Sequence, residues 1–206
     1  MRNRLLVALC AGGMAAGCYL ISGSGAQAVD HPDLFEVTSP DFTDNGLLGE
    51  ANAGIGTSLR GPWGCGGQNV SPALTWSHAP AETQSFAVIM DDPDAASGRG
   101  GNHWITYDIP ASAKGVGRGD ANQPGKFVSG NSGNGAAYHG ACAEPGAKAH
   151  HFIFFVYALD IPPGKLKPGL TKAELMEQIK GHNIAEASLM GRYQRAADGK
   201  ALISAK

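Results

Sequence analysis

Two aspartates and two histidines lie beside apolar stretches with the composition of buried β-strands. Asp92 and Asp94 close a run that begins at Ser85, His103 opens a second run, and His150 precedes a third. A carboxylate beside an imidazole favours the charged imidazole near neutral pH, and a charged imidazole can receive phosphate or carboxylate. These four polar residues therefore predict a small-anion site if the fold brings them together.

Three predicted strands must position these residues. The first runs from Ser85 to the Asp-Pro-Asp turn, where proline removes an N–H donor, and the others cover 103–109 and 152–159. If the first two strands pair antiparallel, the end of one and the start of the next meet at one edge of the sheet. His150 joins them at that edge if the third strand runs parallel to the second.

A glycine-rich loop is expected to complete the site. Residues 111–148 carry almost no periodic apolar signal, and free N–H groups of such a loop can bind an anion. Cys142 lies within this stretch, and Cys65 is the other cysteine outside the first 28 residues. An even number of cysteines in an exported chain predicts one disulfide, with two unpaired thiols as the alternative.

Composition limits the class of protein. The 206 residues suffice for one ordinary domain, and 30 glycines, 12 prolines and only 17% charged residues favour a β-rich fold with many turns. The net charge is −2 and the sequence has no cluster of lysine and arginine. A nucleic-acid partner is therefore not expected.

The N-terminus has the pattern of an export signal. Arginines precede an apolar run over residues 5–21, and a small-x-small sequence ends at Ala28. We expect a signal peptide over 1–28, one domain over 29–206, a periplasmic or secreted location, and no membrane span after cleavage. A lipoprotein anchored through Cys18 and an uncleaved membrane anchor are the alternatives.

The C-terminal part predicts helices. Thr171 and Glu174 fit a capping box, and the apolar residues that follow give one helical face that ends at Gly181. A second short helix is expected from Asn183 to Met190.

Several separate motifs follow one another along the chain. They are Ser71-Pro-Ala-Leu-Thr-Trp76, Asp91-Asp-Pro-Asp94, His103-Trp104, Tyr138-x-Gly140, His150, Val156-Tyr-Ala-Leu-Asp160 and Gly191-Arg-Tyr-Gln-Arg195. Together they resemble the phosphatidylethanolamine-binding proteins, and in particular their bacterial branch, the Raf-kinase-inhibitor-like proteins. The resemblance covers about residues 35–195.

This resemblance implies a mainly β fold in which a large antiparallel sheet packs with a smaller sheet and C-terminal helices. It also implies one anion pocket. No cofactor or metal is expected, because the sequence lacks the usual metal spacings. The pocket positions that it implies are Asp92, Asp94, His103, His150 and the backbone around Ala141 and Cys142.

Two functions follow as alternatives. The first is an exported protein that binds a small anion or a phosphorylated headgroup, with a protein target as a further partner that it would inhibit or modulate. The second is a hydrolase that uses Asp92, His103 and His150. Against the hydrolase, the sequence lacks a Gly-x-Ser-x-Gly elbow and the His-x-x-x-His and Cys-x-x-Cys metal spacings. Cys142 could act as a nucleophile only outside a disulfide.

Overall fold

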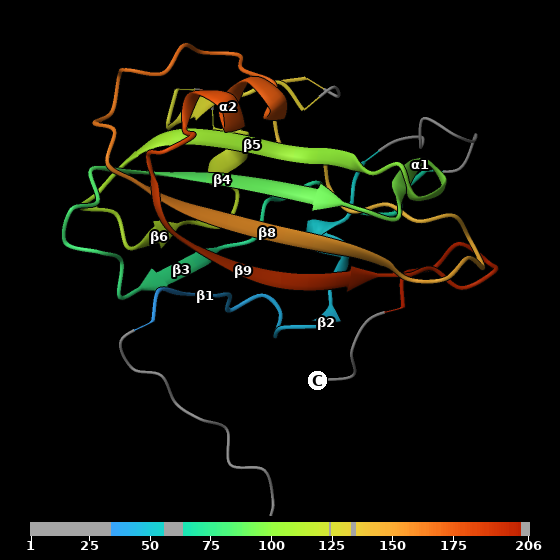
Figure 1. Ribbon diagram of the computed structural model, residues 1–206. Coiled ribbons are helices and arrows are strands. Elements are labelled where there is room, and N and C mark those ends of the chain that lie inside the picture. The colour runs from blue at the N-terminus through green and yellow to red at the C-terminus, as the bar shows by residue number, and fades with distance from the viewer. Residues whose placement is uncertain (1–33, 56–63, 124, 133–134, 203–206) are drawn as a thin grey trace, which may run out of the picture. The chain divides into compact units, whose positions relative to one another are not determined.

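The computed structural model describes residues 34–55, 64–123, 125–132 and 135–202, and these form two β-sheets with short helices beside them (Figure 1). The strands are β1 (Glu36–Thr38), β2 (Gly46–Leu47), β3 (Leu74–Ser77), β4 (Ser85–Asp92), β5 (Gly101–Pro110), β6 (Gly115–Val116), β7 (Val128–Ser129), β8 (His150–Leu159) and β9 (Asn183–Tyr193). The helical segments are η1 (Glu50–Asn52), α1 (Ala95–Gly98), η2 (Asp120–Asn122) and α2 (Lys172–Gln178).

The larger sheet has the strand order β2-β9-β8-β4-β5-β7, and the smaller has the order β1-β3-β6. Strand β4 pairs antiparallel with both β5 and β8, so β5 and β8 run parallel to each other. The predicted meeting of three strand ends at one edge is therefore confirmed. The predicted mainly β fold with two sheets is also confirmed, although β2 pairs parallel with β9, which makes the larger sheet mixed rather than antiparallel.

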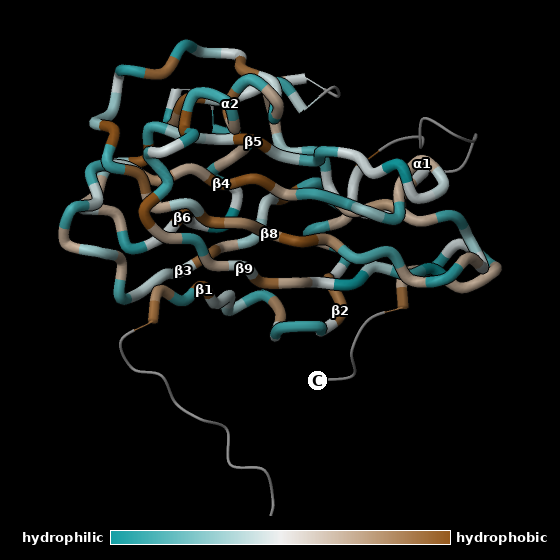
Figure 2. Tube along the Cα trace, viewed as in Figure 1, coloured by the Kyte–Doolittle hydropathy of each residue, from teal (hydrophilic) through white to brown (hydrophobic). Residues whose placement is uncertain are grey.

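The larger sheet has an apolar core on each face. Phe86, Val88 and Met90 of β4 point to one core, which also receives Val37 and Trp76 of the smaller sheet. The residues between them, Ala87 and Ile89, point to a second core on the opposite face, which is covered by α2. Hydrophobic residues accordingly concentrate along β4, β5 and β8 (Figure 2). Because both faces of β4 are covered, its sequence is apolar without alternation.

Helix α2 begins as the sequence predicts. Thr171 accepts a hydrogen bond from the N–H of Glu174, and the Glu174 side chain accepts one from the N–H of Thr171, which completes the capping box. Leu175 of α2 and Ile179, which directly follows the helix, are buried against the larger sheet.

The second predicted helix is wrong, because residues 183–193 form strand β9. Ala, Glu, Leu and Met favour helices, but this segment pairs with β8 along its whole length, and that pairing overrides local propensity. Gly191, expected to stop a helix, instead allows a close approach. A Cβ at Gly191 would lie 2.7 Å from the nearest side-chain carbon of Leu48.

The predicted signal peptide and Cys18 lie outside the described residues. No helix within the described part of the chain is long and apolar enough to cross a membrane.

Candidate functional site

The site is organised around Asp92, the last residue of β4, which is only 1% exposed. One carboxylate oxygen, Oδ1, accepts the backbone N–H groups of Asp94 and Ala95 at 2.9 and 3.1 Å. These bonds hold the Asp-Pro-Asp turn in place. The other oxygen, Oδ2, faces two histidines from neighbouring strands.

His150 is the direct partner of Asp92. Its Nδ1 donates to Asp92 Oδ2 at 2.8 Å, so Nε2 is the ring nitrogen left for another group. The His150 side chain is 22% exposed. The hydrogen bond to Asp92 raises the pKa of His150 above its ordinary value and outweighs the opposing effect of burial. His150 therefore keeps its positive charge to a higher pH than a free histidine does.

His103 lies on the other side of the same carboxylate oxygen, with its Nε2 3.9 Å from Asp92 Oδ2. Its Nδ1 donates to the backbone carbonyl of His139 at 2.9 Å, and the N–H of His139 donates to the carbonyl of His103 at 2.8 Å. Burial lowers the pKa of His103 and outweighs both the bond to His139 and the charge of Asp92. The pKa values of the two imidazoles beside Asp92 are thus shifted in opposite directions, upward for His150 and downward for His103.

His139 is a site residue that the sequence prediction missed. Its ring centroid lies 5.4 Å from that of His103, and its side chain is half-buried. Burial, together with repulsion from His103, lowers the pKa of His139. His139 is the unspecified residue of the Tyr138-x-Gly140 motif, in a loop whose sequence has no periodic apolar pattern. Its residue type was therefore the only signal that pointed to a role in the site. Asp92, His103, His139 and His150 are called the histidine site below.

Asp94 lies at the same edge but contacts a different histidine. Its Oδ2 accepts both the N–H and the Nδ1 of His151 at 2.8 Å, and both side chains are 42% exposed. Partial burial acts to raise the pKa of Asp94, but the hydrogen bonds and charge of His151 lower it overall. Asp94 thus faces solvent rather than His103.

The loop that follows His139 is tied down by several bonds. Gly140 donates its N–H to the Asn69 side chain, and Ala141 donates to the carbonyl of Asn52. A disulfide joins Cys142 to Cys65. Among the residues that the structure describes, the N–H groups of Cys142, Ala143 and Glu144 have no acceptor. The free donors of the loop are therefore those of 142–144, whereas that of Ala141 is used within the fold.

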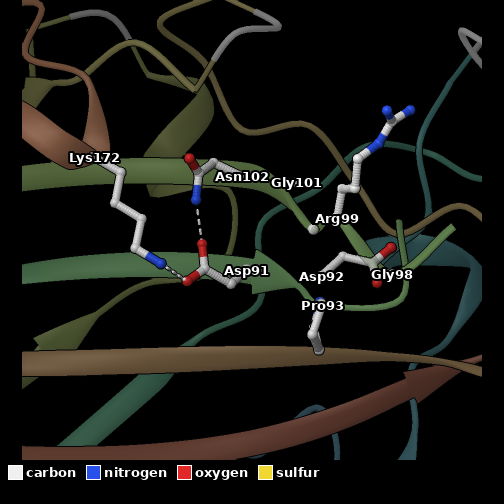
Figure 3. A pocket seen from close by; sticks show the side chains of 9 residues that line it. Asp91, Asp92, Pro93, Gly98, Arg99, Gly101, Asn102 and Lys172 are labelled. Carbon is white, nitrogen blue, oxygen red and sulfur yellow. Dashed lines mark hydrogen bonds and ion pairs between the residues drawn. The ribbon is translucent and has the colours of Figure 1, made fainter. Parts of the chain in front are cut away.

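A hollow of about 400 Å³ lies beside the end of β4 (Figure 3). Asp91 points into it and pairs with Lys172 and Asn102, while Arg99 projects from the far side of Gly101. Asp92 also borders this hollow, but its carboxylate points to His150 and His103, whereas the Asp91 carboxylate points to the other face of the strand. The lining of the hollow includes no histidine among the described residues. The Asp91 carboxylate in the hollow is already paired with Lys172 and Asn102. The histidine site is therefore the stronger candidate for binding an anion.

Within the described ranges, no cluster of three or more His, Cys, Asp or Glu side chains has the arrangement of a metal site.

The sequence and the fold correspond to a known class of protein. Residues 38–194 match the family described as phosphatidylethanolamine-binding protein. Because the match spans more than half of the 206 residues, the chain belongs to the phosphatidylethanolamine-binding protein family, as its motifs predicted.

Individual relatives agree with this assignment. YbcL of Escherichia coli is 34% identical over 166 residues, which cover 78% of this chain and 87% of YbcL. The crystal structure of YbcL, described as a new member of the mammalian PEBP family, has a TM-score of 0.67 at 32% identity and covers 78% of this chain and 98% of that chain. A UPF0098 protein of Methanothermobacter thermautotrophicus is 38% identical over 135 residues, which cover 64% of this chain and 87% of the relative.

One further relative bears on location. LppC of Mycobacterium tuberculosis, which carries a lipoprotein name, is 32% identical over 158 residues, which cover 77% of this chain and 71% of LppC. A disulfide is characteristic of proteins outside the reducing cytosol. Both findings agree with export.

Proposed function

We propose that this protein is an exported binding protein that holds a small oxyanion, or the phosphate of a phosphorylated headgroup, at the histidine site. The observation that carries the proposal is the placement of one buried carboxylate oxygen between two imidazoles, with His150 Nδ1 at 2.8 Å and His103 Nε2 at 3.9 Å. A charged His150 supplies a strong hydrogen-bond donor for an anion.

The neutral histidine adds selectivity. With its Nδ1 proton on the His139 carbonyl, neutral His103 has an unprotonated Nε2 that accepts a hydrogen bond. A hydrogen phosphate can donate its P–OH there while its other oxygens accept from His150. Sulfate has no such proton at neutral pH, so phosphate is the better ligand.

The loop donors complete the binding site. The free N–H groups of Cys142, Ala143 and Glu144 can receive oxyanion oxygens, as consecutive backbone N–H groups do in other anion sites. They replace the predicted donor at Ala141, which is bonded to Asn52.

A phosphorylated headgroup that also carries an amine fits better than phosphate alone. Glu144 is exposed, and its charge acts on His150. A ligand amine can pair with this carboxylate while the phosphate binds the imidazole.

The hydrolase alternative cannot use Cys142 as its nucleophile. Cys142, the cysteine nearest the histidines in the chain, is in the disulfide and has no thiolate to attack with. We therefore favour binding over hydrolysis.

The test is calorimetric titration of the exported protein with phosphate, phosphoethanolamine and sulfate from about pH 5.5 to about pH 8.5, the range in which histidine changes charge. Sulfate keeps the same charge over this range, so its pH dependence reports the protein alone. We expect sulfate affinity to fall as pH rises through the raised pKa of His150, since the neutral ring loses its charged donor. Phosphate should bind more tightly than sulfate, and phosphoethanolamine more tightly than phosphate. Absence of binding by all three ligands, or sulfate affinity that stays flat with pH, would contradict the proposal.

A further inference from the structure

Arg195 is a buried arginine with an unusual set of partners. It follows β9 by two residues and is only 2% exposed. Its Nε donates to the carbonyl of Ala143 at 2.7 Å, and its Nη1 donates to the carbonyl of Gly64. Its Nη2 is buried and has no acceptor. Both acceptors adjoin cysteines, since Gly64 precedes Cys65 and Ala143 follows Cys142.

No carboxylate neutralises this guanidinium within the described residues, where every ion pair involves other side chains. Arginine stays protonated in proteins, and a buried charge without a counterion is costly. Two carbonyl oxygens supply partial compensation, but the net positive charge remains. It is also poorly screened, because solvent is excluded around it.

This charge lies against the loop that carries the free N–H groups. In a trans peptide the C=O and N–H point in opposite directions. Because Arg195 binds the carbonyl of Ala143, the N–H of Glu144 points away from Arg195. On the strand side, Tyr193 at the end of β9 pairs with His150 at the start of β8, and Arg195 follows Tyr193 by two residues.

We propose that Arg195 is a selectivity residue of the histidine site that acts through its charge. Its unscreened positive charge, held against the loop 142–144, favours oxyanions over neutral ligands. This inference rests on the proposed binding function and adds to it a buried residue that contacts no ligand.

Three variants separate charge from packing. Arg195→Met removes the charge, Arg195→Lys keeps the charge but loses the planar fork, and Arg192→Met removes a charge from the end of β9. Arg192 is partly exposed and bonds the carbonyl of Asn45, so solvent screens it. We expect phosphate affinity to fall about tenfold in Arg195→Met, and to stay within about threefold of the parent in the other two.

A second readout does not depend on ligand. Loss of a buried positive charge should raise the pKa of His150 in Arg195→Met, followed by NMR titration of the imidazole, with Asp92, Asp94, Glu144 and His103 unchanged around it. If Arg195 had a purely structural role, Arg195→Met would not both raise the pKa of His150 and weaken phosphate binding.

The outcomes are separable. Equal loss of affinity in Arg195→Lys and Arg195→Met, or an unshifted His150 pKa in Arg195→Met, would overturn the inference. If Arg195→Met does not fold, Arg195→Lys decides: affinity within about threefold of the parent supports the role of charge, and a tenfold loss in folded protein refutes it. Failure of the parent to bind phosphate would instead remove the proposed function, and the pKa readout would still test the charge.

Discussion

Replacement of His150 by alanine is expected to weaken phosphate binding at neutral pH by about tenfold to a hundredfold. The charged Nε2 donates to the oxyanion, and hydrogen bonds that involve a charged group contribute about 1.5–3 kcal/mol. The side chain is 22% exposed and carries little core packing, so the protein should still fold. Its free energy of unfolding should fall by about 1–3 kcal/mol, because Asp92 loses a buried hydrogen bond. Calorimetric titration and urea unfolding measure the two effects.

His182 provides the matched control. Its Nδ1 bonds Asp160 Oδ1 at 2.7 Å, which repeats the His150–Asp92 pairing beyond the other end of β8. His182→Ala should therefore bind phosphate as the parent does. Equal affinity of His150→Ala and the parent, or an equal loss in His182→Ala, would show that the anion binds elsewhere.

Removal of the disulfide is expected to give the largest loss of stability. Cys65 and Cys142 are 77 residues apart in the chain. Cross-linking a loop of this length stabilises a protein by about 4–5 kcal/mol in the chain-entropy model. The double variant Cys65→Ser/Cys142→Ser should therefore lower the free energy of unfolding by about 4 kcal/mol in urea titrations.

The same variant should also weaken phosphate binding, since the free N–H groups of 142–144 lie in the tethered loop. The parent protein under reducing conditions is the control and should show the same losses. A double variant within about 1 kcal/mol of the parent would mean that the bonds of Gly140, Ala141 and Arg195 hold the loop without the disulfide.

The large features of the site could be predicted because they depend on strong local signals. The apolar runs of β4, β5 and β8 identified three strands, and simple antiparallel pairing placed their ends together. Asp92, His103 and His150 follow directly, since each lies at or near the end of one of these strands. The capping box of α2 was predictable for the same reason, because both of its residues lie within one turn.

The rest depends on contacts that the sequence does not encode locally. Strand β9 has helix-favouring residues and becomes a strand only because β8 offers a partner. Asp94 faces solvent because its carboxylate accepts hydrogen bonds from the backbone N–H and the ring of His151. The N–H of Ala141 is used by Asn52, which is distant in the chain. The burial of Arg195 likewise depends on the fold, since a charged side chain is ordinarily exposed.

The most direct test of the oxyanion site is a crystal structure of the exported protein grown with phosphate. The account predicts phosphate density within hydrogen-bond distance of His150 Nε2 and of at least one N–H group of 142–144, with His103 Nε2 facing a phosphate oxygen. Phosphate bound only between Lys172 and Arg99, with the histidine site empty at saturating ligand, would contradict it.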